Sequence, residues 1–209
     1  MNVLITVPLA IVLNVLCFWV STREEVVEKR GRIYEAITSF AIAGILLFMI
    51  LFYKNQNAVF VLKRGMVLAV LTTAAYTDFK AMKIPNKLVL LGLLYRAVLL
   101  PVEFIMQTQY LKSVLLSEII AAGALLVICL LCRLVMHGSL GYGDMKLMVV
   151  MGLLLGLDGI IGAMLNSLLI TFIVAVYLMI SKKKTKKDVI PFAPFLAIGT
   201  CISIILTGM

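Results

Sequence analysis

Seven apolar runs take up most of this 209-residue sequence, with short polar loops between them. They cover residues 3–20, 35–53, 58–77, 88–106, 114–136, 147–180 and 190–207, and each is near or above the length of a membrane-spanning helix. A chain inside lipid must satisfy its own backbone hydrogen bonds, so such runs predict helices. The run 147–180 is too long for one helix, and Leu157-Asp158-Gly159 is expected to break it. The sequence therefore predicts an all-α, polytopic transmembrane helical bundle of about eight spans.

The composition is also that of a membrane protein. Hydrophobic residues make up 63% of the chain and charged residues 14%, whereas a soluble domain is about half apolar and about a quarter charged. No polar stretch is long enough for a separate water-soluble domain. We therefore expect one integral-membrane domain over 1–209, with N-terminal spans in 1–57 and a core in 58–209. The run 3–20 has no basic segment before it and no small-residue cleavage site, so it is expected to be a retained helix.

The lysines and arginines indicate how the helices are oriented. If loops 21–34, 79–87, 137–146 and 181–189 share one side, that side holds 14 of the 19 basic residues, counting Arg133 at a helix end. By the positive-inside rule this side is cytoplasmic. The densest basic cluster, residues 182–187, is expected to contact anionic lipid. A nucleic-acid surface would interleave aromatic residues with the basic ones, so no nucleic-acid partner is expected.

Two aspartates, Asp78 and Asp144, lie at the ends of apolar runs and fall on this same predicted side. An ionisable residue at such a place is costly and points to a functional site. Hydrolysis by paired carboxylates needs one protonated and one ionised acid around a water molecule. Asp144 follows Gly141-Tyr142-Gly143 and is expected to precede a helix directly; taken alone, it is also compatible with an ordinary helix cap. Together the two acids predict a catalytic pair, with glycines that allow close approach of a substrate.

Three segments resemble the type IV prepilin peptidases. The first is Asp78-Phe79-Lys80-Ala81-Met82-Lys83-Ile84-Pro85-Asn86, which resembles the family's first-aspartate segment. The second, Gly141-Tyr142-Gly143-Asp144-Met145-Lys146-Leu147, is similar to the second-aspartate segment and is followed by Gly152 and Gly156. The third, residues 190–200, is similar to the terminal helix. The segments occur in the family's order across residues 65–205.

This resemblance implies a membrane-embedded aspartic endopeptidase that removes a short basic leader from prepilin or pseudopilin precursors. The enzyme would lie in the prokaryotic cytoplasmic membrane with its active site facing the cytoplasm. Asp78 and Asp144 would be the catalytic pair. The residues expected to bind substrate are Gly141, Gly143, Lys80, Ile84, Pro85, Asn86, Lys146 and Pro194. No cofactor is expected, and the partners would be the precursors and the lipid bilayer.

The chain departs from the long members of that family between its first two spans. Those enzymes carry a cysteine-bearing zinc module there, associated with methylation of the newly exposed N-terminus, whereas Ser21 to Tyr34 contains no cysteine. All four cysteines lie in apolar runs, and Cys129-x-x-Cys132 has no second pair with which to bind zinc. We therefore expect a form with peptidase activity alone and no metal.

Two alternative functions remain open. Presenilin and signal peptide peptidase also use a Gly-x-Gly-Asp motif, but their Pro-Ala-Leu segment is not matched by Pro194-Phe195-Leu196. A small proton-coupled transporter would have its acids near the bilayer midplane and related halves, and neither is evident in the sequence.

Two further features predict packing inside the membrane. Arg96 lies within an apolar run and needs a buried partner, for which Glu103 and Glu118 are candidates. The small residues 121–124 suit a close contact between two helices.

Overall fold

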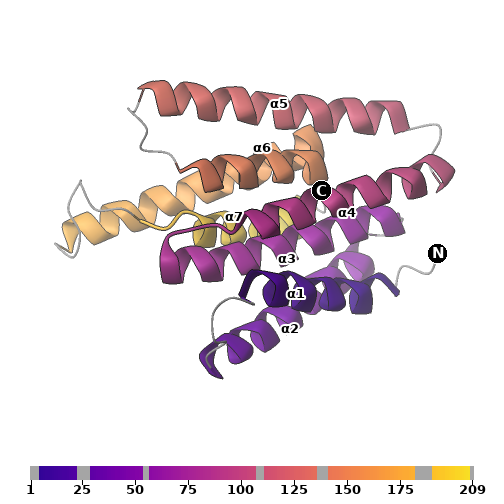
Figure 1. Cartoon of the computed structure of the whole chain (residues 1–209), viewed down its shortest axis with the longest axis horizontal. Coiled ribbons are helices and arrows are strands. Elements are labelled where there is room, and N and C mark those ends of the chain that lie inside the picture. Colours follow the sequence, from indigo (N-terminus) through magenta and orange to yellow (C-terminus); the bar gives the residue numbers. More distant parts are fainter. Residues whose placement is uncertain are drawn as a thin grey trace.

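The computed structural model describes residues 5–22, 29–53, 57–106, 111–135, 141–181 and 190–207, and within these ranges the chain is helical without a strand (Figure 1). The helices are α1 (Thr6–Thr22), α2 (Lys29–Phe52), α3 (Ala58–Ala81), α4 (Asn86–Met106), α5 (Leu111–Val135), α6 (Tyr142–Ile180) and α7 (Ala193–Thr207). In this described part, five helices, α2 to α6, are long and apolar enough to cross a membrane, and α1 and α7 are shorter apolar helices. The chain is a multi-pass membrane protein, but the expected eight spans are not confirmed.

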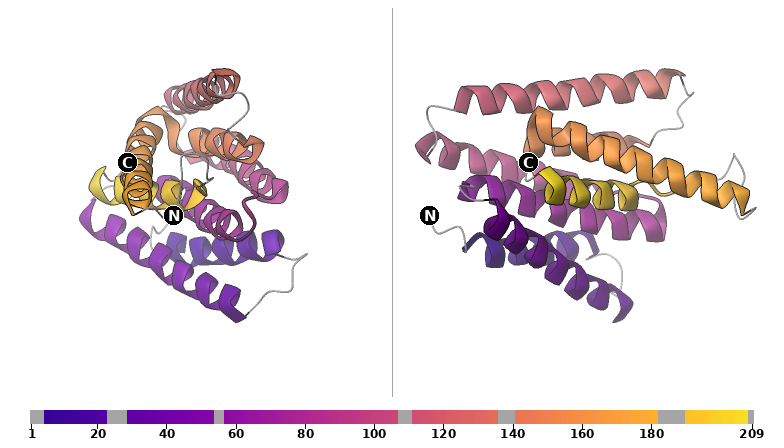
Figure 2. Two further views of the ribbon diagram at one scale, coloured as in Figure 1. Left: turned by 90° about the vertical axis from the view of Figure 1, so that its left-hand side faces the viewer. Right: turned by 180° about the vertical axis from the view of Figure 1, so that it is seen from behind.

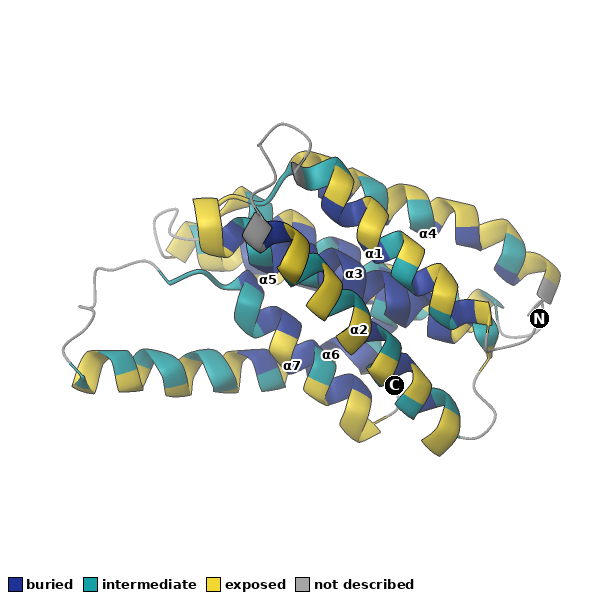
Figure 3. Cartoon of the chain, turned by 90° about the horizontal axis from the view of Figure 1, so that it is seen from below, coloured by how far each residue is buried: buried dark blue, intermediate teal, exposed yellow. Residues whose placement is uncertain are grey.

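Helix α3 lies in the middle of the bundle and is buried along most of its length (Figure 3). It contacts α1, α2, α4, α6 and α7, whereas α5 packs mainly on α6 at the edge. A polar link adds to the apolar contacts, because Asn14 of α1 donates a hydrogen bond to Ser39 of α2 (2.8 Å) and accepts one from Thr72 of α3 (3.1 Å). A helix held from several sides in this way is a rigid support for the residues at its end.

Helix α6 is broken at Gly156, one residue before the turn expected from the sequence. Gly156 has φ +69° and ψ −175°, a conformation that only glycine adopts readily. The amide of Leu157, released from the helix by the break, donates a hydrogen bond to the hydroxyl of Ser117 (2.9 Å). The second half then returns toward the end of the bundle where α6 began, and it runs beside α7 (Figures 1 and 2).

Several helices extend beyond the predicted apolar runs, and this changes the setting of both aspartates. Asp78 lies inside α3, which continues to Ala81, and does not end the helix. Asp144 is the third residue of α6, whereas the sequence predicts that it precedes the helix. Gly141 is the N-cap residue of α6. Polar residues at a helix end lower the mean hydropathy without breaking the backbone, so hydropathy underestimates helix length. The basic residues 182–187 lie outside the described residues.

The predicted close contact at residues 121–124 is confirmed for α5 and α6. A Cβ atom added to Gly152 of α6 would lie 2.9 Å from the backbone of Ala122 in α5. Small residues on both helices therefore let the two backbones meet, which is a common basis of helix association in lipid. This contact fixes the half of α6 that carries Asp144.

Candidate active site

Asp78 is held at the end of α3 by the way that helix closes. The backbone N–H of Met82 donates a hydrogen bond to the carbonyl oxygen of Asp78 (2.8 Å), with Met82 in the left-handed conformation (φ 51°). Pro85 then accepts a hydrogen bond from the N–H of Leu88 (3.1 Å) as α4 begins. The Asp78 side chain is only 7% exposed. A buried carboxylate of this kind needs a hydrogen-bond donor.

That donor is a backbone amide of the last helix. The N–H of Ala193, the first residue of α7, lies 3.0 Å from Oδ2 of Asp78. The first amides of a helix have no partner within the helix, so the start of α7 can offer this bond without losing one of its own. Sequence reasoning did not find this donor, because a backbone amide has no residue signature.

Asp144 approaches from the first turn of α6. The helix begins when Gly141 accepts a hydrogen bond from the N–H of Met145 (3.2 Å). The Asp144 side chain is half-buried, and its Oδ1 atom is buried with no hydrogen-bond partner among the described residues. An unpartnered buried oxygen at this place leaves the carboxyl group able to bond to a water molecule or a substrate.

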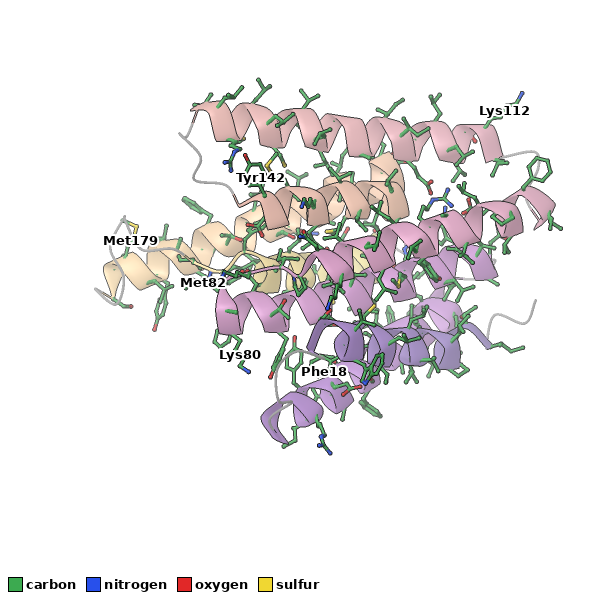
Figure 4. The ribbon with its side chains drawn as sticks, viewed as in Figure 1. Phe18, Lys80, Met82, Lys112, Tyr142 and Met179 are labelled. Atoms are coloured by element: carbon green, nitrogen blue, oxygen red, sulfur yellow. The ribbon has the colours of Figure 1, made fainter. Side chains whose placement is uncertain are left out.

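The two aspartates lie at the same end of the bundle and interact electrostatically. In Figure 4, the labelled residues Lys80, Met82 and Tyr142 mark this end of the bundle, and Lys112 marks the opposite end. In the part of the chain that the structure describes, neither carboxylate is paired with a lysine or arginine. Two carboxyl groups at one end of the bundle without a paired cation can serve together as an acid and a base.

The two glycines before Asp144 make room for neighbours within the protein. A Cβ atom on Gly143 would lie 3.1 Å from the Cβ atom of Ile84, and one on Gly141 would lie 3.0 Å from Oδ2 of Asp144. Neither glycine has a positive φ, so they are needed here for close approach and not for a special backbone conformation. Gly143 thus allows the loop after Asp78 to lie against the turn that carries Asp144, whereas Gly141 leaves room for the Asp144 side chain itself.

Of the other residues expected to bind substrate, two form a hydrogen bond with each other and three are described by their exposure. Lys146 donates a hydrogen bond to the side-chain oxygen of Asn86 (3.0 Å), which ties the start of α6 to the start of α4. Lys80 is exposed, whereas Pro85 and Pro194 are half-buried in the α3–α4 loop and the first turn of α7. All of these residues surround the end of the bundle that carries the two aspartates.

A second group of buried charges lies toward the opposite end. As predicted, Arg96 pairs with Glu118 (Nε to Oε2, 2.8 Å) and with Glu103 (Nη2 to Oε2, 2.9 Å). Lys63 of α3 also pairs with both glutamates, a contact that the sequence alone does not predict. Lys63 is 5% exposed inside α3. We refer to Lys63, Arg96, Glu103 and Glu118 as the charge cluster; about 22 Å of helix separates it from Asp78.

The cysteines show no arrangement of a metal centre within the described residues. Cys129 is buried and donates its S–H to the sulfur of Met148 (3.3 Å), whereas Cys132 is exposed. No group of three histidine, cysteine or acidic side chains in this part of the chain is placed to hold a metal ion.

Comparisons with known proteins identify the family of the chain. The family model of the type IV leader peptidase family matches residues 65–176, which is more than half of the chain and includes both aspartates. The prepilin leader peptidase/N-methyltransferase of Bacillus subtilis (strain 168) is 28% identical over 136 residues, covering 65% of this chain. The match spans 52% of that relative, so the chain corresponds to about half of its length. No solved structure matches the chain. On the family match, this chain belongs to the type IV leader peptidase family.

Proposed function

We propose that this protein is an aspartic endopeptidase that removes the short basic leader of prepilin-like precursors at the cytoplasmic face of the membrane. The observation that carries the proposal is that Asp78 of α3 and Asp144 of α6 lie at the same end of the bundle, where Gly143 of α6 meets Ile84 of the α3–α4 loop. The family match and the relative in Bacillus subtilis support a leader-peptide substrate.

In the proposed reaction a water molecule lies between the two carboxyl groups. One carboxylate takes a proton from the water while the other carboxyl group gives its proton to the oxygen of the scissile carbonyl, and a tetrahedral diol forms. The C–N bond then breaks as the leaving amine receives a proton, and the second acid recovers its own from the diol. The products are the leader, which ends in a new carboxylic acid, and the mature protein, which has a new free N-terminus. This sequence of steps needs no metal or cofactor.

The cytoplasmic placement is supported by the distribution of charge. Lys80 at the end of α3, Lys83 in the α3–α4 loop and Lys87 at the start of α4 lie close together in the chain, and Lys146 bonds to Asn86 beside them. Basic residues at one end of a helical bundle favour the cytoplasmic side. Lysines do not attract a basic leader, so we propose that specificity depends mainly on the small residue before the cut. The substrate's apolar helix would remain in the bilayer beside the bundle.

We also propose that the protein acts as a peptidase without methyltransferase activity. The segment between α1 and α2 contains no cysteine, so it cannot supply the zinc ligands of the module found in the long family members. The product is therefore expected to keep an unmethylated N-terminus.

Co-expression with candidate precursors tests the proposal. Each precursor should carry a basic leader that ends in glycine, followed by an apolar helix, and mass spectrometry of the product gives both the cleavage site and the methylation state. The expected product begins directly after the glycine and is unmethylated. A cut inside the apolar helix would instead favour a presenilin-like protease, and intact precursors of every type would contradict the proposal.

A substitution at Gly143 tests how the two motif segments fit together. Gly143→Ala is expected to slow cleavage about tenfold to a hundredfold, because the new Cβ atom, 3.1 Å from the Cβ atom of Ile84, displaces the turn that carries Asp144. Ile84→Gly should recover part of the lost rate in the double variant, since it removes the Cβ atom that the new methyl group meets. Ile84→Gly alone serves as the control. Absence of any recovery would mean that the glycine is needed for a different contact.

A further inference from the structure

The hydrogen bond between α7 and Asp78 joins two residues that are 115 positions apart in the chain. Ala193 is fully buried and Asp78 nearly so, which protects the bond from exchange with water. Among the described residues the Asp78 side chain makes this one hydrogen bond, and it uses one oxygen, Oδ2. The other oxygen, Oδ1, is left available to another partner.

The donor is held firmly in place by the packing of α7. The helix starts with a hydrogen bond from the N–H of Leu196 to the carbonyl oxygen of Phe192 (3.1 Å). Farther along, Gly199 lies so close to Ser167 of α6 that no side chain fits between the two helices. Helix α7 also contacts α3, so the amide of Ala193 is fixed relative to Asp78 before any substrate arrives.

From this geometry we infer that the backbone N–H of Ala193 is a positioning group that assigns different roles to the two aspartates, an inference that rests on the proposed function. An N–H group can only donate, so Oδ2 of Asp78 must act as the acceptor. The amide therefore keeps Oδ2 engaged as an acceptor and leaves Oδ1 as the atom that can take up a proton. Asp78 is therefore the base, and it receives the proton of the water at Oδ1.

Asp144 then holds a proton and acts as the acid. Its buried Oδ1 has no hydrogen-bond partner in the described residues, so the carboxyl group is open to the scissile carbonyl. As the water oxygen bonds to the carbonyl carbon, the water proton passes to Asp78 and the Asp144 proton passes to the carbonyl oxygen. When the C–N bond breaks, Asp78 gives its proton to the amine and Asp144 regains one from a hydroxyl of the diol. Both acids return to their starting states, and one water molecule is consumed.

Replacing the amide by an ester tests the inference without adding an atom. Incorporation of lactic acid at position 193 substitutes oxygen for the N–H and leaves the side chain unchanged. We expect kcat for a synthetic precursor, made of a basic leader ending in glycine and an apolar helix, to fall about tenfold to a hundredfold. KM should change little, because the amide acts through Asp78 and does not contact the substrate.

The matched control is the same replacement at position 196, with the hydroxy acid of leucine. An ester at 193 also weakens the carbonyl of Phe192 as an acceptor, and the ester at 196 removes the hydrogen bond to that same carbonyl altogether. A purely structural role of the amide would thus reduce kcat in both variants, whereas our inference predicts that the 196 ester stays within about threefold of the unmodified protein. Ala193→Pro provides a genetic version, since proline lacks the N–H and suits the first position of a helix.

The outcomes separate this inference from the proposed function. A 193 ester with unchanged kcat, or with a loss that the 196 ester matches, would overturn the positioning role while cleavage by the unmodified protein upholds the peptidase. Absence of cleavage by the unmodified protein would instead count against the proposed function. A loss of kcat confined to the 193 ester, with unchanged elution and melting temperature in detergent, would support the inference.

Discussion

Asp78→Asn and Asp144→Asn are each expected to reduce leader cleavage by about a thousandfold or more. An asparagine has nearly the size of an aspartate and can still accept a hydrogen bond from the N–H of Ala193, so the bundle should remain intact. The amide cannot take up or release the proton that water activation requires, and either replacement therefore stops the reaction. The measurement is the fraction of co-expressed precursor that loses its leader, followed by mass spectrometry.

Asp158→Asn is the matched control for these two variants. Asp158 also belongs to α6, but it is exposed and follows the break at Gly156. The Asp158→Asn protein should process the precursor at the normal rate and insert into the membrane to the same level as the two catalytic variants. Near-normal processing by either Asp78→Asn or Asp144→Asn would remove that aspartate from the catalytic pair.

The placement of both aspartates at one end of the bundle could be predicted from the sequence, and the reason is connectivity. Apolar runs of membrane length must alternate in direction, so the number of runs between two residues decides whether they share a side. Two runs, 88–106 and 114–136, separate Asp78 from Asp144, so the two aspartates share a side. The break in the run 147–180, which the structure has at Gly156, decides only the side of the residues that follow it. The residue that breaks the helix was identified with an error of one position, because Asp158 and Gly159 also favour a turn.

The contacts inside the site could not be predicted in the same way. The bond from Ala193 to Asp78 involves a backbone amide, and any residue except proline at position 193 offers the same donor. The approach of Gly143 to Ile84 depends on how the start of α6 meets the α3–α4 loop, which hydropathy does not describe. Hydropathy and motifs therefore locate the site, and tertiary packing decides which atoms meet within it.

Lys63 shows a third limit of sequence reasoning. A lysine near the end of an apolar run normally extends toward the membrane surface, so its side chain was not expected inside the bundle. Here Lys63 forms ion pairs with Glu103 of α4 and Glu118 of α5, which are 40 and 55 residues away in the sequence. Only the three-dimensional arrangement of three helices shows that the burial of this charge is compensated.

The charge cluster supports the second large prediction, which concerns stability. Glu118→Ala is expected to lower the free energy of unfolding by about 3–5 kcal/mol, because it leaves Lys63 and Arg96 buried with a single carboxylate between them. The measurement is thermal unfolding of the purified protein in detergent, with the amount inserted in membranes as a second readout.

Two controls show whether the loss comes from unbalanced charge. A cavity of about 310 Å³ is lined by Glu103, Glu118 and the exposed Asp158, among others. Asp158→Ala removes an acid from the wall of this cavity and should change the free energy of unfolding by no more than about 0.5 kcal/mol. The double variant Lys63→Met, Glu118→Leu removes one cation and one anion together and keeps the ion pair between Arg96 and Glu103. It should recover most of the stability that Glu118→Ala loses, since replacement of a buried ion pair by apolar side chains of similar volume is often nearly neutral.

If Glu118→Ala unfolds at the same temperature as Asp158→Ala, the four charges do not stabilise the bundle as a unit. If instead the double variant is no more stable than Glu118→Ala, the particular hydrogen bonds of Glu118, and not the balance of charge, hold α3, α4 and α5 together.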